Sequence, residues 1–535
     1  MGSPPLTHEP LATSGSRARS GASAWMRSRG AMAGAAVVVG AILLPVYDRL
    51  SSTAVVTADS ANAVLQGRSM ADGNVLLAGW TLSGASFYAT DLPFYAAITA
   101  VRGLSPVAAH DVGAAIYTLL VLAACFLARG RARGMAAVWR MAVTLILLIA
   151  PAPGPAVQLL LLGPFHAGTT LLLLLALLVV DRAGERLLGA AAVGALLALA
   201  QLSDALALYV GVLPIVAVSV AHLVRSSERQ RSDVALLAAA VASIPASLLL
   251  LALIGQLGGF TTVPLQASFA QIEDMPKNAA LTIEGALLLF GANFFGQPVV
   301  SIDTLSILVH LAGFGFVLAT CRWVVLAWRR GEAPDRLTQV LLVAMTIDVA
   351  AHLFSNQAID LMTSRYLIPF LAFGAVLAGR VGADRLRSAE RLRLAAAAVG
   401  AAYLVFLGLS LRTPPAPAPE AQLAAFLERQ HLDYGVAAYW QASTVTVESG
   451  GRVRVRAVRI GDPQPVAYLW EAEGFWYDPR QPGNDARFVV RDTADRRSID
   501  RDAIEAAFGP PTDVYQVGSF EVLVWDRNLL DELAQ

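Results

Sequence analysis

Two aspartates stand at the starts of two predicted helices in the polar stretch 55–110. Asp59 opens the helical pattern Ala58–Arg68, and Asp91 precedes the pattern Leu92–Val101. A carboxylate at a helix start accepts hydrogen bonds from free backbone N–H groups, so capping is the plain expectation for both. Two such helices lying in the plane of the lipid headgroups would also suit the floor of a catalytic cleft.

Three further polar residues lie at the outer ends of apolar segments. His166, in the run GPFHAG, either sits at the membrane interface or lines a cleft. Asp204 lies at the tip of a predicted hairpin over 187–224, where a charge is either solvated or functional. Arg365 stands at the outer end of its span, where an arginine commonly anchors a helix at the headgroups.

Three polar residues inside predicted spans are expected to be structural. Asp348 and His352 are one helical turn apart and face the same way, so we expect them to pair with each other. His310 is expected to make a hydrogen bond between two helices.

The composition indicates that most of this chain lies in the lipid bilayer. Of its 535 residues, 56% are hydrophobic, and the mean hydropathy is +0.57. The formal net charge is zero, which argues against a nucleic-acid partner. Cys125 and Cys321 lie in apolar segments, so we expect neither a disulfide nor a cysteine metal site. Lys277 is the only lysine among many arginines, a bias that suggests a GC-rich bacterial genome.

Eleven stretches approach the roughly 20 apolar residues that a membrane-spanning helix needs. The predicted spans are 32–48, 111–128, 136–151, 157–180, 187–203, 205–224, 234–256, 303–328, 338–355, 365–379 and 392–411. A shorter apolar stretch, 281–297, contains Glu284 and Asn293, and we interpret it as an interfacial or re-entrant helix.

Arginine-rich loops decide the expected orientation, because such loops stay in the cytoplasm. With eleven spans, every arginine-rich segment falls on one side: the N-terminal tail, Arg129–Arg133, Asp181–Arg186, Arg225–Arg231, Arg329–Arg336 and Arg380–Arg393. We therefore expect a multi-pass protein of the bacterial inner (plasma) membrane with its N-terminus in the cytoplasm. The odd number of spans sends the C-terminal segment to the periplasm or the cell exterior.

Three parts are expected along the chain: a disordered cytoplasmic tail (1–30), a membrane domain (31–412) and a small α+β domain outside the membrane (413–535). The last part begins with the stiff run PPAPAP. Helices are expected at 420–431 and about 499–508. The predicted strands are Ser443–Val447, Arg452–Val458, Phe488–Val490 and Phe520–Trp525.

Several short motifs, in this order, resemble the GT-C glycosyltransferase superfamily, which includes protein O-mannosyltransferases and lipid A aminoarabinose transferases. The external loop 49–110 has an aspartate about ten residues after the first span, then A-x-x-x-x-x-G, D-x-P-x-Y and GLSPVAAH. Further matches are LSDALALYVGVLPIVAV (202–218), TSRYLIPFLAFGAVLAG (363–379) and DYGVAAYWQASTVTVESGGRVRV (433–455). The resemblance covers most of residues 30–535.

The resemblance implies a sugar donor carried on a polyprenyl phosphate and an acid in the first external loop that acts at the acceptor hydroxyl. Carried over by position, Asp59 would be the general base or orienting carboxylate. Arg365 would balance the departing phosphate, while Asp91, His166 and Asp204 are candidates for substrate binding. Many superfamily members have paired acids where Asp59 stands alone. Members also differ in metal use, so a divalent metal remains possible as a cofactor.

The sequence therefore predicts an α-helical polytopic membrane protein that transfers a sugar to an envelope glycan, lipid or protein acceptor. Two other classes stay open. A transporter or flippase of lipid-linked sugars would be expected to show an internal repeat, and we find none. A non-catalytic scaffold would keep the fold without the chemistry.

Overall fold

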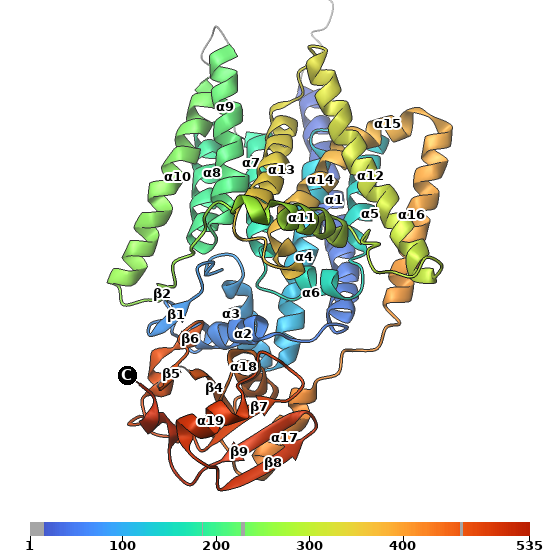
Figure 1. Ribbon diagram of the computed structural model, residues 1–535. Coiled ribbons are helices and arrows are strands. Elements are labelled where there is room, and N and C mark those ends of the chain that lie inside the picture. The colour runs from blue at the N-terminus through green and yellow to red at the C-terminus, as the bar shows by residue number, and fades with distance from the viewer. Residues whose placement is uncertain (1–14, 184–185, 226–230, 461–463, 535) are drawn as a thin grey trace, which may run out of the picture.

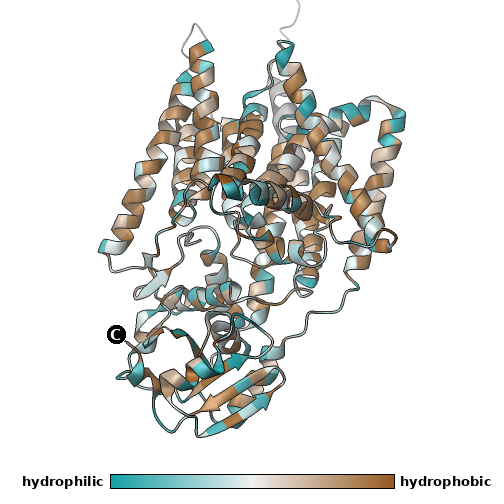
Figure 2. Ribbon diagram, viewed as in Figure 1, coloured by the Kyte–Doolittle hydropathy of each residue, from teal (hydrophilic) through white to brown (hydrophobic). Residues whose placement is uncertain are grey.

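The computed structural model describes residues 15–183, 186–225, 231–460 and 464–534. Long helices form one bundle, and a domain with a β-sheet lies against one end of it (Figure 1). The polytopic helical fold with a small C-terminal sheet domain is thus confirmed. Figure 2 shows that apolar residues dominate the long helices and that polar residues gather in the C-terminal part.

Every predicted span contains helix. The long helices, with short π- or 3-10 segments in line with two of them, are α1 (Gly15–Ser51), α4 (Pro106–Arg129), α5 (Gly134–Ile149), α7 (Ala167–Ala183), α8 (Leu187–Ser203), η1 (Leu208–Val212) with α9 (Leu213–Arg225), α10 (Arg231–Gln256), α12 (Ile302–Arg329), α13 (Arg336–Phe354), η3 (Leu361–Leu367) with α14 (Ile368–Leu377), η4 (Ala378–Gly382) and α15 (Ala383–Ser388), and α16 (Glu390–Ser410). Within the described residues, eight helical stretches are long and apolar enough to cross a membrane.

Two boundaries differ from the prediction. The predicted span 157–180 is broken: the short helix α6 (Pro155–Leu161) ends before a turn at 162–166, and α7 begins after it. Gly163 and Pro164 lie in this turn, and both residue types interrupt a helix. At the other boundary, α1 begins at Gly15, whereas residues 1–14 of the predicted tail lie outside the described residues.

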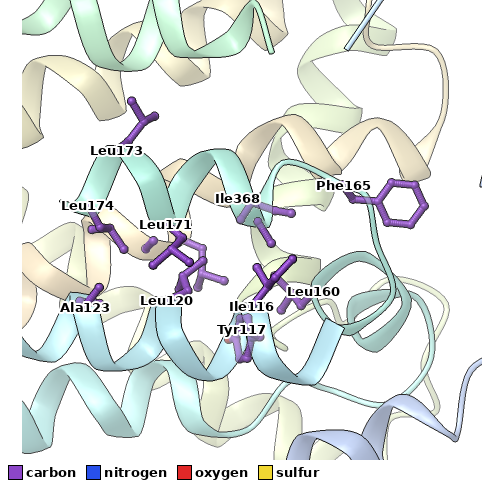
Figure 3. Packing of buried hydrophobic residues seen from close by; sticks show 14 of the residues in the cluster. Ile116, Tyr117, Leu120, Ala123, Leu160, Phe165, Leu171, Leu173, Leu174 and Ile368 are labelled. Atoms are coloured by element: carbon purple, nitrogen blue, oxygen red, sulfur yellow. The ribbon is translucent and has the colours of Figure 1, made fainter. Parts of the chain in front are cut away.

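The centre of the bundle is formed by α4, which packs against α7 and α14, and by the stretch Leu361–Ser388 that contains α14, whose most apolar part is 83% buried. In its most apolar stretch, 72% of the residues of α4 are buried, against 22% for α10, α12 and α16. Figure 3 shows Ile116, Leu120 and Ala123 of α4 facing Leu171 and Leu174 of α7. The apolar outer helices present their side chains outward, as expected of surfaces that contact lipid.

The segment between α1 and α4 folds onto the end of the bundle that carries the C-terminal domain. It contains the two predicted helices, α2 (Ala58–Ala71) and α3 (Leu92–Arg102), with strand β1 (Trp80–Leu82) between them. Later in the chain, β2 (Thr261–Thr262), η2 (Ile272–Asp274) and α11 (Met275–Leu289) form the second long connection. Figure 1 shows α11 lying crosswise to the long helices, in the orientation expected of an interfacial or re-entrant helix.

After α16 the chain runs through the proline-rich linker into a six-stranded mixed sheet of order β5-β4-β3-β7-β9-β8. The elements are α17 (Pro419–Arg429), β3 (Tyr434–Ala437), α18 (Tyr439–Glu448), β4 (Arg454–Ile460), β5 (Pro465–Ala467), β6 (Ala472–Glu473), η5 (Gly474–Tyr477), β7 (Phe488–Asp492), α19 (Arg501–Phe508), β8 (Asp513–Val517), β9 (Phe520–Val524) and η6 (Leu529–Glu532). Helices α17 and α18 pack on one face of the sheet, and α19 packs on the other.

The predicted strand Ser443–Val447 is wrong, because these residues form part of α18. Their alternating β-branched pattern suits a strand. However, β3 and β4 are parallel neighbours, and parallel strands need a crossover connection, usually helical. The side chains of Thr444 and Thr446 accommodate the helix by donating hydrogen bonds to the carbonyls of Gln441 and Ala442.

Candidate functional site

The carboxylate of Asp59 is not a helix cap. Thr57 is the N-cap residue of α2, and its hydroxyl accepts a hydrogen bond from the backbone N–H of Ser60 at 3.3 Å. Asp59 lies in the first helical turn, half-buried. The capping expectation for Asp59 is therefore wrong, since the hydroxyl of Thr57 already fills that role and leaves the carboxylate for other partners.

The partner of Asp59 comes from the C-terminal domain. The hydroxyl of Tyr439 lies 2.6 Å from Oδ1 of Asp59 and 2.9 Å from Oε2 of Glu471. Glu471 is buried, with 7% of its surface exposed. Asn62 of α2 donates a hydrogen bond to Oε2 of Glu471 at 3.3 Å, and the hydroxyl of Ser443 donates to the amide oxygen of Asn62. Two carboxyl groups from distant parts of the chain thus meet at one phenol.

The hydroxyl of Tyr439 has one hydrogen, so it can donate to Oδ1 of Asp59 or to Oε2 of Glu471 but not to both. One of the two carboxyl groups must hold a proton for both contacts to be favourable. Burial raises the pKa of Glu471 well above its ordinary value, and the negative charge of Asp59 adds to the rise. Glu471 therefore carries the shared proton at neutral pH.

A small three-stranded sheet holds Glu471 in this position. Strand β1 of the first external loop pairs antiparallel with β6, which directly follows Glu471, and parallel with β2. Trp80 and Trp476 pack edge to face across this join, with ring centroids 5.0 Å apart. Glu471 itself has a left-handed backbone conformation, with φ of 54°. Non-glycine residues rarely adopt this conformation without a constraint from the surrounding structure.

Asp91 is the N-cap residue of α3, but its side chain makes no capping hydrogen bond. The carboxyl group is 1% exposed, and its Oδ2 has no hydrogen-bond partner among the described residues. Burial raises its pKa to about 7, and the negative charge of Asp204 contributes to the rise. The capping role expected for Asp91 is thus wrong as well, and a buried carboxyl remains available for a proton or a ligand.

Asp204 and His166 form a buried pair beside Asp91. Nδ1 of His166 lies 2.6 Å from Oδ2 of Asp204, and the hydroxyl of Thr169 donates to the same oxygen at 2.8 Å. Both residues of the pair are at most 3% exposed, so the hairpin tip at Asp204 is not in water. This contact leaves Nε2 of His166 without a hydrogen-bond partner among the described residues. The ring of His166 packs against Phe87 and Tyr366.

Arg365 stands at the edge of the same group. Its guanidinium lies 5.5 Å from the ring centre of Phe165 and 5.6 Å from that of Tyr366. No ion pair of Arg365 is present in the described part of the chain, which leaves its donors free for an anion.

No protein-family model and no curated protein matches this chain. Several solved structures resemble it. One is the archaeal oligosaccharyltransferase AglB from Archaeoglobus fulgidus in complex with an inhibitory peptide and a dolichol-phosphate, with TM-score 0.48, 13% identity, and coverage of 86% of this chain and 69% of that one. The apo form (TM-score 0.46, 13% identity) and a form tethered to an acceptor peptide (TM-score 0.47, 12% identity) have the same coverage. Identities this low leave the function of this chain to be argued from its own residues.

Tyr95 of α3 connects the two groups. Burial raises its pKa well above the ordinary value, and the charges of both Asp91 and Glu471 add to this, although its hydroxyl has no hydrogen-bond partner among the described residues. The structure therefore brings Asp91, His166, Asp204 and Arg365 together and places Asp59 in an adjoining group. No contact joins Asp59 directly to Arg365 in the described residues.

Two of the polar residues in the spans behave differently from expectation, and one as expected. Asp348 accepts a hydrogen bond from the backbone N–H of Phe370 at 2.9 Å, whereas His352 is 2.8 Å from the hydroxyl of Thr282. The expected Asp348–His352 pair is therefore absent, because each side chain finds a closer partner on another helix. His310 makes the expected contact with a neighbouring helix: its Nε2 lies 3.3 Å from the carbonyl of Ala150, the C-cap residue of α5.

Sequence reasoning singled out neither Glu471 nor Tyr439. One signal could have indicated Glu471: it lies in the run YLWEAEGFWYD, where two glutamates stand among five aromatic residues. In such surroundings a carboxyl group is unusual unless it is paired.

For a metal ion, the described residues offer no group of three or more His, Cys, Asp or Glu side chains. The carboxyl groups of Asp59 and Glu471 are joined by hydrogen bonds through the hydroxyl of Tyr439. A cation site would instead need carboxylate oxygens that are free to bind the ion.

Proposed function

We propose that this protein is a membrane glycosyltransferase that moves a sugar from a polyprenyl-phosphate donor to a hydroxyl of an envelope glycan, lipid or protein. The reaction would take place at the end of the bundle covered by the C-terminal domain. The charge rule applied to the arginine-rich loops supports an external position for that end of the bundle.

The observation that carries the proposal is the state of Asp59. Its carboxylate is released from capping, held by Tyr439 and kept next to a protonated Glu471. A carboxylate that is held in place and partly exposed is what a general base requires. The missing second acid of the superfamily pattern is supplied here from the C-terminal domain, by Glu471.

In the proposed reaction, the acceptor oxygen attacks C1 of the donor sugar. The new bond joins the acceptor oxygen to C1, the bond from C1 to the phosphate oxygen breaks, and the hydroxyl proton passes to Asp59. The released polyprenyl phosphate carries the negative charge that leaves with it, and Arg365 stabilises this charge. Asp91 and the His166–Asp204 pair would bind hydroxyl groups of the sugars.

The experiment uses cells that lack this protein and are complemented with wild type, Asp59→Asn or Asp72→Asn. Asp72 lies at the other end of α2, exposed and paired with Arg68, so its variant is a matched control. Mass spectrometry of envelope glycans and polyprenyl-linked sugars should show a lipid-linked sugar that accumulates and a glycan that loses one residue. Wild type and Asp72→Asn should restore both, whereas Asp59→Asn should restore neither despite normal expression.

Other outcomes would favour the alternatives. Full complementation by Asp59→Asn would remove the base from the proposal and favour a scaffold role. Movement of a lipid-linked sugar across vesicles that contain only the purified protein would favour a flippase.

A further inference from the structure

A polar cavity of about 620 Å³ opens at the end of the bundle opposite the C-terminal domain. Its lining comes from four of the arginine-rich segments: Arg131 after α4, Arg182 at the end of α7, Arg336 at the start of α13 and Arg380 in η4. α4 has 24 residues and so is about 36 Å long, and it separates this cavity from the Asp59 group beside its other end. The cavity is therefore distinct from the site of the proposed reaction.

Carboxylates fix three of the cavity arginines in place. Arg140 of α5 lies 2.6 Å from Asp384, and Arg336 lies 2.7 Å from Asp233. Arg380 is 10% exposed and lies 2.7 Å from Asp181 and 3.3 Å from Asp335. These ion pairs hold the guanidinium groups at defined positions. The arginine side chains therefore lose little further conformational entropy when a ligand binds.

The arginines nevertheless keep unused donors. Arg131 and Arg182 also line the cavity, and no ion pair joins either of them to a carboxylate in the part of the chain that the structure describes. Guanidinium donors without a carboxylate partner, as in Arg131 and Arg182, can bind an anion that enters the cavity.

The balance of charged groups at the cavity also favours an anion. Five guanidinium groups line the cavity (Arg131, Arg140, Arg182, Arg336 and Arg380), and four carboxylates lie among them (Asp181, Asp233, Asp335 and Asp384). Arg129 and Arg133 of the same loop add positive charge beside it. The rule that arginines stay in the cytoplasm explains why they occupy these loops, but it does not require their side chains to converge on one cavity.

We propose that this arginine cavity binds a phosphate-bearing anion. Guanidinium groups match phosphate oxygens with two parallel hydrogen bonds, and a cavity of this volume accommodates a small headgroup or a diphosphate. The same chemistry fits an anionic phospholipid headgroup and a soluble phosphate compound.

The test uses the purified full-length protein and two probes, inorganic pyrophosphate in detergent and phosphatidylglycerol in nanodiscs whose bulk lipid is phosphatidylcholine. The cavity variant is Arg131→Gln with Arg182→Gln, which leaves the carboxylate-paired arginines intact. The control variant is Arg391→Gln with Arg393→Gln, two exposed arginines at the start of α16. Calorimetry measures pyrophosphate binding, and native mass spectrometry counts retained phosphatidylglycerol.

Wild type and the control variant should bind at least one probe saturably, and the cavity variant should bind it about tenfold or more weakly. The probe that responds identifies the source of the phosphate. Failure of wild type to bind either probe would overturn the proposal, as would equal binding by the cavity variant and wild type. Because the readout is binding and not sugar transfer, the result is independent of the proposed enzymatic function.

Discussion

The hydroxyl of Tyr439 and the carboxylate of Asp59 are 2.6 Å apart although 380 residues separate them in the chain. Tyr439 is the first residue of α18 in the C-terminal domain, and Asp59 lies in the first turn of α2 in the first external loop. These two helices pack directly on each other. The C-terminal domain is therefore part of the candidate site and not an appendage, because it supplies both the hydroxyl and the second carboxyl group.

Replacing Tyr439 with phenylalanine should lower sugar transfer roughly tenfold to a hundredfold. The change removes a hydrogen bond to a charged group, which contributes about 1.5–3 kcal/mol, and frees Asp59 to rotate. The measurement is the restoration of the glycan by the variant in cells lacking the protein. Tyr515→Phe is the control, because the Tyr515 hydroxyl has no hydrogen-bond partner in the described residues while its ring packs on Phe426. Equal transfer by both variants would contradict the orienting role.

Glu471→Gln should keep transfer within about threefold of wild type at neutral pH. Glutamine has the shape of the protonated carboxyl group and, like it, both donates and accepts hydrogen bonds. Glu471→Ala, which leaves Tyr439 and Asn62 without this partner, should lose most of the activity. The same glycan measurement applies, with expression followed by immunoblot. A large loss in Glu471→Gln would mean that Glu471 works as a carboxylate and that the shared proton resides elsewhere.

Arg365→Gln should reduce transfer about a hundredfold, and Arg365→Lys should recover part of the loss. A lysine supplies the charge for the departing phosphate but not the two parallel hydrogen bonds of a guanidinium. Arg102→Gln is the matched control, because Arg102 is exposed at the end of α3 and its one ion pair among the described residues is with Asp111. Transfer assays in membranes, supplied with whichever lipid-linked sugar accumulates in the deletion cells, measure this. Wild-type rates for Arg365→Gln would leave Arg365 as a headgroup anchor.

Gly67→Ala should destabilise the floor of the site by about 3 kcal/mol or more. A Cβ at this position would lie 2.5 Å from Cβ of Tyr95 and 2.6 Å from its carbonyl carbon, so α3 would have to move away from α2. Gly255→Ala in α10, where a Cβ meets nothing within 4 Å, should leave the protein unchanged or slightly more stable. Thermal unfolding of the purified protein compares the two, and equal melting temperatures would contradict the close packing of α2 on α3.

The sequence was sufficient for the parts of the fold that depend on local pattern. Apolar runs marked the spans, and residue spacing of about 3.6 marked α2 and α3, because these signals lie within 20 consecutive residues. The break at 162–166 was missed since the apolar run continues through it, and α18 was taken for a strand since its β-branched residues alternate.

The candidate site was harder to predict, because its contacts join segments that only tertiary packing brings together. Asp59 and Asp91 could be selected by their positions at helix starts, but their roles as caps could not be rejected without Thr57 and the buried surroundings of Asp91. Glu471 approaches Asp59 through the β1–β6 pairing, which rests on two residue pairs and leaves no pattern in the sequence.

Asp91→Asn should stabilise the protein at and above neutral pH. Burial raises the folded-state pKa of Asp91 to about 7, above the ordinary value of 3.8 that applies to the unfolded chain. The unfolded state therefore releases this proton first, and the wild-type protein loses stability as the pH rises from about 4 to about 7. The full effect is on the order of 4 kcal/mol, at about 1.4 kcal/mol for each pH unit. Asparagine has no proton to lose, so the variant should escape this part of the decline.

Melting temperatures of wild type and Asp91→Asn, measured between pH 4 and 8, should converge at the acidic end and diverge towards neutral pH. Asp111→Asn is the control, because Asp111 pairs with Arg102 at the surface, where an ion pair contributes little. Curves for wild type and Asp91→Asn that stay parallel would show that Asp91 is ionised in the folded protein. In that case Oδ2 of Asp91, unpartnered in the described residues, must be balanced by a cation or a bound donor group.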